Sequence, residues 1–238
     1  MVLIFPTKEL YRKEGVPKTA ASVLMVWLLP ARVISSVKTI NLGLIAVISY
    51  LCASFTNADT ILVHGDSLSA GYGMLPEDSW VTLLGVELAT DYTVVNSSIS
   101  GETTKGGLAR LPLLLETYQP ELVIIELGAN DGLRGYPITQ MQDNLKQMIN
   151  LAKAADSEVI ILGIQLPPNF GKRYTEPFYN SFASLAKQED TGYLPFLLDG
   201  VAQYQALMQS DGLHPTKEAQ PRILENVLPV VKQALDMP

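Results

Sequence analysis

The chain has 238 residues, 47% of them hydrophobic, which is enough to bury one substantial core. It holds 24 acidic and 17 basic residues, so its formal net charge is −7 at neutral pH. An acidic chain without a basic patch argues against nucleic acid as a partner.

Residues 1–58 are predicted to be an N-terminal extension and secretion signal. Lys38 precedes an almost uncharged run from Leu42 to Ala53, and small residues end the segment at Ala58, as is typical of a secretory signal. The apolar run is shorter than the ~20 residues that a membrane-spanning helix needs. Removal near Ala58 is therefore favoured over a permanent membrane anchor, which predicts a periplasmic or extracellular protein.

The start of translation has two candidates, Met1 and Met25. A second apolar stretch, residues 20–30, follows a charged segment that is longer than a bacterial signal usually carries, whereas a start at Met25 would omit that segment. The only cysteine, Cys52, lies in the presequence, so a mature chain from Asp59 has no thiol. Without the six basic and two acidic residues of 1–58, the mature chain has 11 basic against 22 acidic residues, a net charge of −11.

Residues 59–238 are predicted to form one domain in which strands alternate with helices. Apolar runs bounded by turn residues predict buried strands at 60–64, 92–96, 122–127, 159–164 and 193–198. Helical spacing of apolar residues occurs at 79–89, 103–118, 138–155, 175–188 and 216–235. The alternation predicts a five-stranded parallel sheet with helices on both faces, a three-layer α/β/α sandwich of the flavodoxin-like kind.

A candidate nucleophile follows the first predicted strand. The strand ends in Gly65-Asp66-Ser67-Leu68, which places the Ser67 hydroxyl at the carboxyl edge of the sheet, where such folds bind ligands. Asp and Ser are also common helix N-caps, so this segment alone fits a structural turn equally well.

A candidate base lies near the C-terminus. The mature chain has two histidines, His64 and His214. His64 falls within the first strand, where a structural role is favoured. His214 follows Asp211 by three residues in a polar loop, so the carboxylate can fix the imidazole tautomer and stabilise the imidazolium.

Two further segments could stabilise an oxyanion. Gly101 follows the second strand and would let a backbone N–H approach a substrate closely. Asn130 follows the third strand and can supply a side-chain N–H. Each segment alone fits a turn with a helix cap, but four such segments at the same sheet edge favour an active site.

The four segments together resemble the SGNH or GDSL hydrolases, whose sequence blocks centre on a serine, a glycine, an asparagine and a histidine. The blocks here are Gly65-Asp66-Ser67-Leu68, Gly101, Gly128-Ala129-Asn130-Asp131 and Asp211-Gly212-Leu213-His214-Pro215. The likeness runs from about Asp59 to the C-terminus. Within the family it is greatest to small secreted bacterial enzymes with acyl-CoA thioesterase, lysophospholipase and arylesterase activities. His64 stands where that group is expected to have an aliphatic residue.

The resemblance implies a serine esterase that hydrolyses acyl esters or thioesters through a covalent acyl-enzyme. It implies that Ser67 is the nucleophile, His214 the base and Asp211 its orienting acid, as the residues themselves indicate. The implied oxyanion hole consists of the backbone N–H groups of Ser67 and Gly101 and the side chain of Asn130. This chemistry requires neither a metal nor a cofactor.

Apolar residues in or beside the predicted site loops would suit an acyl chain, although loop packing would explain them equally well. They are Leu68, Leu133, Pro167, Pro168 and Phe170. We expect a monomer whose partners are small acyl esters, thioesters or lysolipids, with transient contact to membrane lipid. Two alternatives stay open: a carbohydrate O-acetyl esterase on the same scaffold, and a non-catalytic binding protein.

Overall fold

The computed structural model describes residues 59–237, so the predicted secretion signal and the choice between Met1 and Met25 lie outside the described residues. Five parallel strands form one sheet in the order β2-β1-β3-β4-β5, which confirms the predicted sheet. They are β1 (Asp59–Gly65), β2 (Tyr92–Asn96), β3 (Leu122–Glu126), β4 (Glu158–Leu162) and β5 (Gly192–Leu194).

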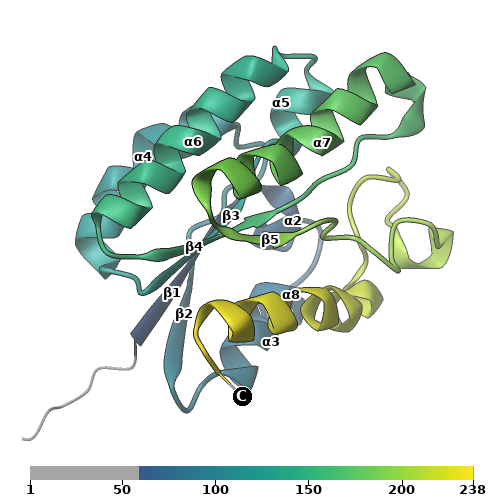
Figure 1. Ribbon diagram of the computed structural model, residues 1–238. Coiled ribbons are helices and arrows are strands. Elements are labelled where there is room, and N and C mark those ends of the chain that lie inside the picture. Colours follow the sequence, from purple (N-terminus) through teal and green to yellow (C-terminus); the bar gives the residue numbers. More distant parts are fainter. Residues whose placement is uncertain (1–58, 238) are drawn as a thin grey trace, which may run out of the picture. The chain divides into compact units, whose positions relative to one another are not determined.

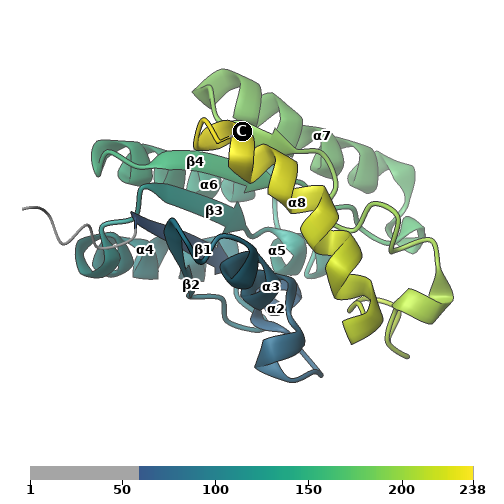
Figure 2. The same cartoon turned by 90° about the horizontal axis from the view of Figure 1, so that it is seen from below.

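Helices cover both faces of this sheet. The helices are α2 (Ser67–Ala70), α3 (Trp80–Glu87), α4 (Thr104–Tyr118), α5 (Ala129–Leu133), α6 (Ile138–Ala154), α7 (Lys172–Glu189) and α8 (Gln220–Ala234). Short 3-10 turns add η2 (Pro76–Asp78), η3 (Pro168–Phe170), η4 (Gln205–Leu207) and η5 (Lys217–Ala219). The long helices α4, α6 and α7 lie on one face (Figure 1), and α3 and α8 lie on the other, the side from which Figure 2 is viewed.

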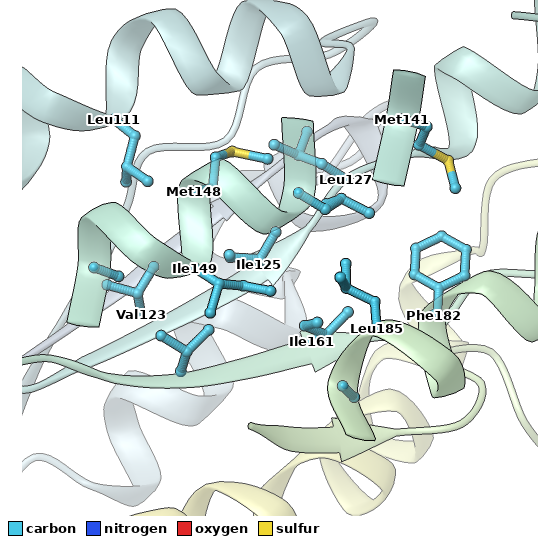
Figure 3. Packing of buried hydrophobic residues seen from close by; sticks show 14 of the residues in the cluster. Leu111, Val123, Ile125, Leu127, Met141, Met148, Ile149, Ile161, Phe182 and Leu185 are labelled. Carbon is cyan, nitrogen blue, oxygen red and sulfur yellow. The ribbon is translucent and has the colours of Figure 1, made fainter. Parts of the chain in front are cut away.

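The central strand β3 shows why two helical layers are needed. All five of its residues are buried, because successive side chains point to opposite faces and each face has a helical layer to pack against. Val123 and Ile125 belong to the cluster under α4, α6 and α7, whereas Leu122 and Ile124 belong to the cluster under α3 and α8. In Figure 3, side chains of α6 and α7, among them Met148 and Phe182, gather above β3 and β4.

Two predicted boundaries differ most from the structure. The last strand ends at Leu194 and not at residue 198, because Pro195 has no N–H to continue the ladder and the chain turns. The last helix begins at Gln220 and not at residue 216, since residues 217–219 form a 3-10 turn first. The short helices α2 and α5 are too brief to give a periodic pattern, and they were expected only as turns or helix starts.

The strand order positions the functional site. The chain leaves β1 for β2 on one side and then crosses to β3 on the other, so the loops after β1 and β3 diverge and open a crevice at the carboxyl edge. In the part from 59 to 237, no helix has the length and apolar character needed to cross a membrane.

Candidate functional site

Ser67 is the first residue of α2, and one residue, Asp66, separates it from the end of β1. Asp66 caps this helix, since its Oδ1 accepts a hydrogen bond of 3.1 Å from the Leu68 N–H. The helix ends at Gly71, whose φ of 73° is left-handed and suits glycine. From α3, the Trp80 Nε1–H donates to the Leu68 carbonyl at 3.2 Å. This short helix is therefore held at both ends, and the Ser67 hydroxyl has a fixed position.

The structure brings Ser67, His214 and Asp211 together in one chain of hydrogen bonds. His214 Nε2 lies 2.8 Å from Ser67 Oγ, and His214 Nδ1 lies 2.7 Å from Asp211 Oδ2. The other carboxylate oxygen of Asp211 accepts from the backbone N–H groups of Leu213 at 2.9 Å and His214 at 3.0 Å. The loop backbone thus holds the Asp211 carboxylate in place, and the carboxylate in turn orients the His214 imidazole.

The surroundings of Asp211 keep it ionised. Partial burial acts to raise its pKa, but the hydrogen bonds from the His214 side chain and from the His214 and Leu213 backbone outweigh it and lower the pKa to about 2. An ionised carboxylate only accepts hydrogen bonds, so the proton between the two side chains lies on His214 Nδ1. The lone pair of Nε2 is then free to accept the Ser67 proton.

Gly101 and Asn130 line the same cavity as Ser67 and His214. Gly101 has a φ of +79°, and its carbonyl accepts a hydrogen bond of 3.0 Å from Arg134 Nη2. Asn130 Nδ2 donates one hydrogen to Asp66 Oδ2 at 3.0 Å. Because a carboxamide nitrogen carries two hydrogens, the second is left for another acceptor.

A cavity of about 300 Å³ opens beside Ser67. Among the residues predicted to contact an acyl chain, Leu68, Leu133 and Pro167 line it, whereas Pro168 and Phe170 lie in η3 and do not. The sequence did not indicate a further part of its apolar wall, which comes from the loops after β4 and β5. These residues are Ile164, Leu166, Phe196, Leu197 and Leu198.

Comparison with known proteins shows the family of this chain. A model of the GDSL-like lipase/acylhydrolase family matches residues 63–221. The chain belongs to this family. It is 53% identical over 181 residues to the esterase TesA of Pseudomonas aeruginosa, covering 75% of this chain and 90% of that protein. It is 46% identical over 168 residues to the thioesterase 1/protease 1/lysophospholipase L1 of Escherichia coli, covering 71% and 81%.

The fold agrees with solved structures of the same family. A crystal structure of TesA, 52% identical, superposes with a TM-score of 0.72 and covers 74% of this chain and 99% of that one. With such relatives, this GDSL family member is a serine hydrolase that acts on ester bonds.

Gln209, which the sequence did not single out, and Tyr72 support the Ser67 and His214 loops of this GDSL hydrolase. Gln209 Nε2 donates to the carbonyls of Tyr72 at 2.8 Å and Pro215 at 3.0 Å, and its backbone N–H donates to the His214 carbonyl at 2.7 Å. Gln209 therefore joins the segment after α2 to the His214 loop. The half-exposed Tyr72 ring covers one side of the His214 ring, with 4.3 Å between the two ring centroids.

His64 has a structural place outside this site. It is fully buried, and its ring nitrogens lie 3.1 Å from Ser97 Oγ and 3.0 Å from the Gly107 carbonyl. Burial lowers the pKa of His64 to about 4, so the ring is neutral at physiological pH. It ties β1 to the segment after β2 and to α4. Between residues 59 and 237, no three His, Cys, Asp or Glu side chains are grouped to hold a metal ion.

The role of Gln209 can be tested by Gln209→Ala. The substitution removes two hydrogen bonds that hold the His214 loop against the Ser67 segment, each worth ~1 kcal/mol. We expect kcat/KM for a p-nitrophenyl ester to fall on the order of tenfold with circular dichroism unchanged. Gln205→Ala, the same change at an exposed position in η4, is the control. Equal activity of the two variants would contradict the bridging role.

Proposed function

We propose that Ser67 is the nucleophile, His214 the general base and Asp211 the residue that orients the base. The observation that carries this proposal is the continuous chain of hydrogen bonds, 2.8 Å from Ser67 Oγ to His214 and 2.7 Å from His214 to Asp211, at the mouth of an apolar cavity. A nucleophile, a base and an orienting acid in this order are what acyl transfer requires.

In the proposed reaction, Ser67 Oγ attacks the acyl carbonyl carbon while its proton passes to His214 Nε2. The tetrahedral intermediate collapses, the bond to the alcohol or thiol breaks, and the leaving group takes the proton from Nε2. Water then attacks the acyl-enzyme and gives a proton to His214. That proton returns to Ser67 Oγ as the free acid leaves. The Asp211 carboxylate stabilises the imidazolium formed in each half of the cycle.

The oxyanion of each intermediate is proposed to bind three donors: the backbone N–H groups of Ser67 and Gly101 and Nδ2 of Asn130. Support comes from their position, since all three residues line the cavity beside His214. Asn130 in addition has one amide hydrogen already bound to Asp66, which orients the other.

The substrate class is proposed to be esters and thioesters with a medium or long acyl chain, lysophospholipids included. A wall built from leucine, isoleucine, phenylalanine and proline side chains suits an acyl chain more than a sugar. The relatives are named esterase and thioesterase 1/protease 1/lysophospholipase L1, names that cover esters, thioesters and lysophospholipids. We expect the leaving group to face solvent beside the half-exposed Tyr72, which lines the cavity and is proposed to contact membrane lipid transiently.

The carbohydrate O-acetyl esterase is less well supported. An aromatic platform for a sugar ring is the feature that would favour it, but Trp80, the tryptophan of the described domain, is fully buried under α2. The binding-protein alternative is disfavoured because Ser67, Asp211 and His214 are all in hydrogen-bonding geometry.

The proposed roles can be tested by Ser67→Ala and Asn130→Ala with p-nitrophenyl esters. We expect Ser67→Ala to lower kcat by on the order of 10⁴-fold or more. Asn130→Ala should lower kcat by roughly 10²–10³-fold with KM nearly unchanged, because the oxyanion forms only after attack. Exposed Ser184→Ala and Asn150→Ala on α7 and α6 are matched controls. Activity that survives in Ser67→Ala would disprove the nucleophile.

The acyl pocket can be tested by Leu133→Trp, which fills part of the 300 Å³ cavity. We expect kcat/KM for C8–C16 p-nitrophenyl esters to fall by on the order of 10-fold to 100-fold while C2 esters change little, since each buried CH₂ contributes ~0.8 kcal/mol. Leu113→Trp, on the exposed side of α4 and outside the cavity, is the control. A uniform loss across chain lengths would place the acyl chain elsewhere.

The protein is proposed to act in the periplasm or outside the cell as a monomer, with its mature domain starting near Asp59. Support comes from the small residues that end the predicted signal at Ala58. Expression from Met1 and from Met25 in Escherichia coli should give a periplasmic product whose N-terminus, by mass spectrometry, is Asp59. A chain that starts at Asp59 serves as the cytoplasmic control. Full-length protein in the membrane fraction would instead support the anchored alternative.

A further inference from the structure

Two acidic side chains are buried directly beneath the Ser67 turn, and the proposed reaction does not use them. Glu126 ends β3 and Asp66 follows β1, and neither residue is exposed to solvent. Glu126 Oε2 accepts hydrogen bonds from Ser69 Oγ at 2.7 Å and from the Asp66 N–H at 3.2 Å. A Cβ on Gly65 would lie 2.7 Å from the same oxygen, so the space around the carboxyl group is filled.

The arrangement of the two acids favours a single proton on the pair. The Asp66 N–H donates to Glu126 Oε2, so the two buried carboxyl groups are neighbours, and a proton on one of them relieves the repulsion between two buried charges. Oε2 of Glu126 already accepts two bonds, whereas Oε1 is buried and no described residue donates to it. A proton on Oε1 turns this unpaired acceptor into a donor.

The two pKa shifts assign the proton to Glu126. Complete burial raises the pKa of Glu126 well above its ordinary value, and the nearby charge of Asp66 raises it further. Burial also raises the pKa of Asp66, but hydrogen bonds from Leu68 and Asn130 and the charge of His214 oppose it, so that it reaches only about 6. Near neutral pH, Glu126 is therefore the acid and Asp66 carries the single negative charge.

The charged Asp66 can control which end of the Asn130 amide faces the site. Its Oδ2 accepts from Asn130 Nδ2 at 3.0 Å, while its Oδ1 is engaged by the Leu68 N–H. A flip of the amide would place the Asn130 oxygen against a carboxylate oxygen, and two acceptors at that distance repel. A protonated Glu126 carries no charge, so Asp66 is the one charged acceptor of this pair that faces Asn130.

We propose that Asp66 and Glu126 are positioning residues: the buried pair holds one proton and one negative charge, and this charge keeps the amide hydrogens of Asn130 at the oxyanion site. The inference depends on the proposed role of Asn130 as an oxyanion donor. Neither acid touches the substrate, so both act on the reaction through Asn130.

The coupling can be measured by combining Asp66→Asn with Asn130→Ala. The Asn side chain at position 66 has one acceptor oxygen, whereas Asp66 offers two, to the Leu68 N–H and to Asn130 Nδ2. The orientation of the Asn130 amide is therefore no longer enforced. We expect Asp66→Asn alone to lower kcat by about 10-fold to 100-fold with KM within about threefold. In the Asn130→Ala background it should lower kcat by no more than about threefold, because the residue through which it acts is gone.

The outcomes of this cycle separate the two proposals. If Asn130→Ala alone leaves kcat unchanged, Asn130 is not an oxyanion donor, and both the proposed role and the inference fail. If Asn130→Ala is slow but Asp66→Asn costs the same factor in both backgrounds, only the positioning role is overturned.

The proton on Glu126 is tested by comparing Glu126→Gln with Glu126→Leu. Glutamine is uncharged like the protonated acid and keeps an N–H donor, and its oxygen still accepts from Ser69, so kcat should stay within about threefold of the parent. Leucine keeps the side-chain volume but can neither donate nor accept a hydrogen bond, so it should lower kcat at least tenfold. Equal losses in the two variants would show that an ionised Glu126 is needed and would overturn the inference.

Infrared spectroscopy gives a readout that does not depend on activity or on the leucine variant folding. At neutral pH, exposed carboxyl groups are ionised, so a protonated carboxyl band from the parent protein reports a buried acid. We expect this band in the parent and its loss in Glu126→Gln. A parent spectrum without the band would overturn the shared-proton arrangement.

Discussion

The site depends on one hydrogen bond between the first loop of the domain and the last. Ser67 and His214 are separated by 147 positions in the sequence, yet Oγ and Nε2 lie 2.8 Å apart. This contact forms only if both loops are held, because an error of about 1 Å in a reacting pair can cost on the order of 100-fold in rate. The fold supplies the constraint: parallel strands end at one edge, so loops distant in sequence meet there.

Each side of that hydrogen bond has its own support. On the Ser67 side, the Asp66 cap and the Trp80 indole fix a helix of four residues that is too short to be stable alone. On the His214 side, Gln209 joins the loop to the Tyr72 segment through side-chain and backbone hydrogen bonds. The geometry of the site therefore comes from neighbouring hydrogen bonds and not from the site residues alone.

Three carboxyl groups near the site have different roles because their environments differ. Asp211 lies in a partly exposed loop and receives three hydrogen bonds, which keep its pKa near 2 and its charge fixed. Glu126 is fully buried, and protonation costs less than a second buried charge. The pKa of Asp66, about 6, lies between those of Asp211 and Glu126. The result is two negative charges near His214, both of which favour the imidazolium that forms during acyl transfer.

The sequence predicted the parts of this protein that depend on local pattern. The apolar runs identified the five strands, and the short segments just beyond three of them contain Ser67, Gly101 and Asn130, which line one cavity in the structure. It did not identify Gln209, whose contacts exist only after the chain has folded. Glu126 could have been noticed, because a carboxylate within an otherwise apolar strand must be paired or protonated once buried.

The acyl pocket shows most clearly what local pattern leaves undetermined. Pro168 and Phe170 lie beside the predicted loop, but the 3-10 turn there directs the chain away, and Leu166 and the residues after β5 form the wall. The loops after β4 and β5 pack backbone against backbone, since a Cβ on Gly163 would lie 2.1 Å from the Pro195 carbonyl. Two backbone hydrogen bonds hold these loops together further. The Gly163 N–H donates to the Leu194 carbonyl at 2.7 Å, and the Leu197 N–H donates to the Gly163 carbonyl at 3.0 Å.

Leu133 lines another part of the pocket and is only partly buried. Leu133 ends the five-residue helix α5, and Gly135 just beyond it has open space around it. Chain-length preference in this enzyme should therefore be set mainly on the Leu133 side, where a side chain can change size without displacing packed backbone. The chemistry at Ser67 and His214 would not be affected, because the supports of those residues lie in α2, α3 and the Gln209 loop. On the proposed assignment, selectivity and catalysis are thus carried by different parts of the same sheet edge.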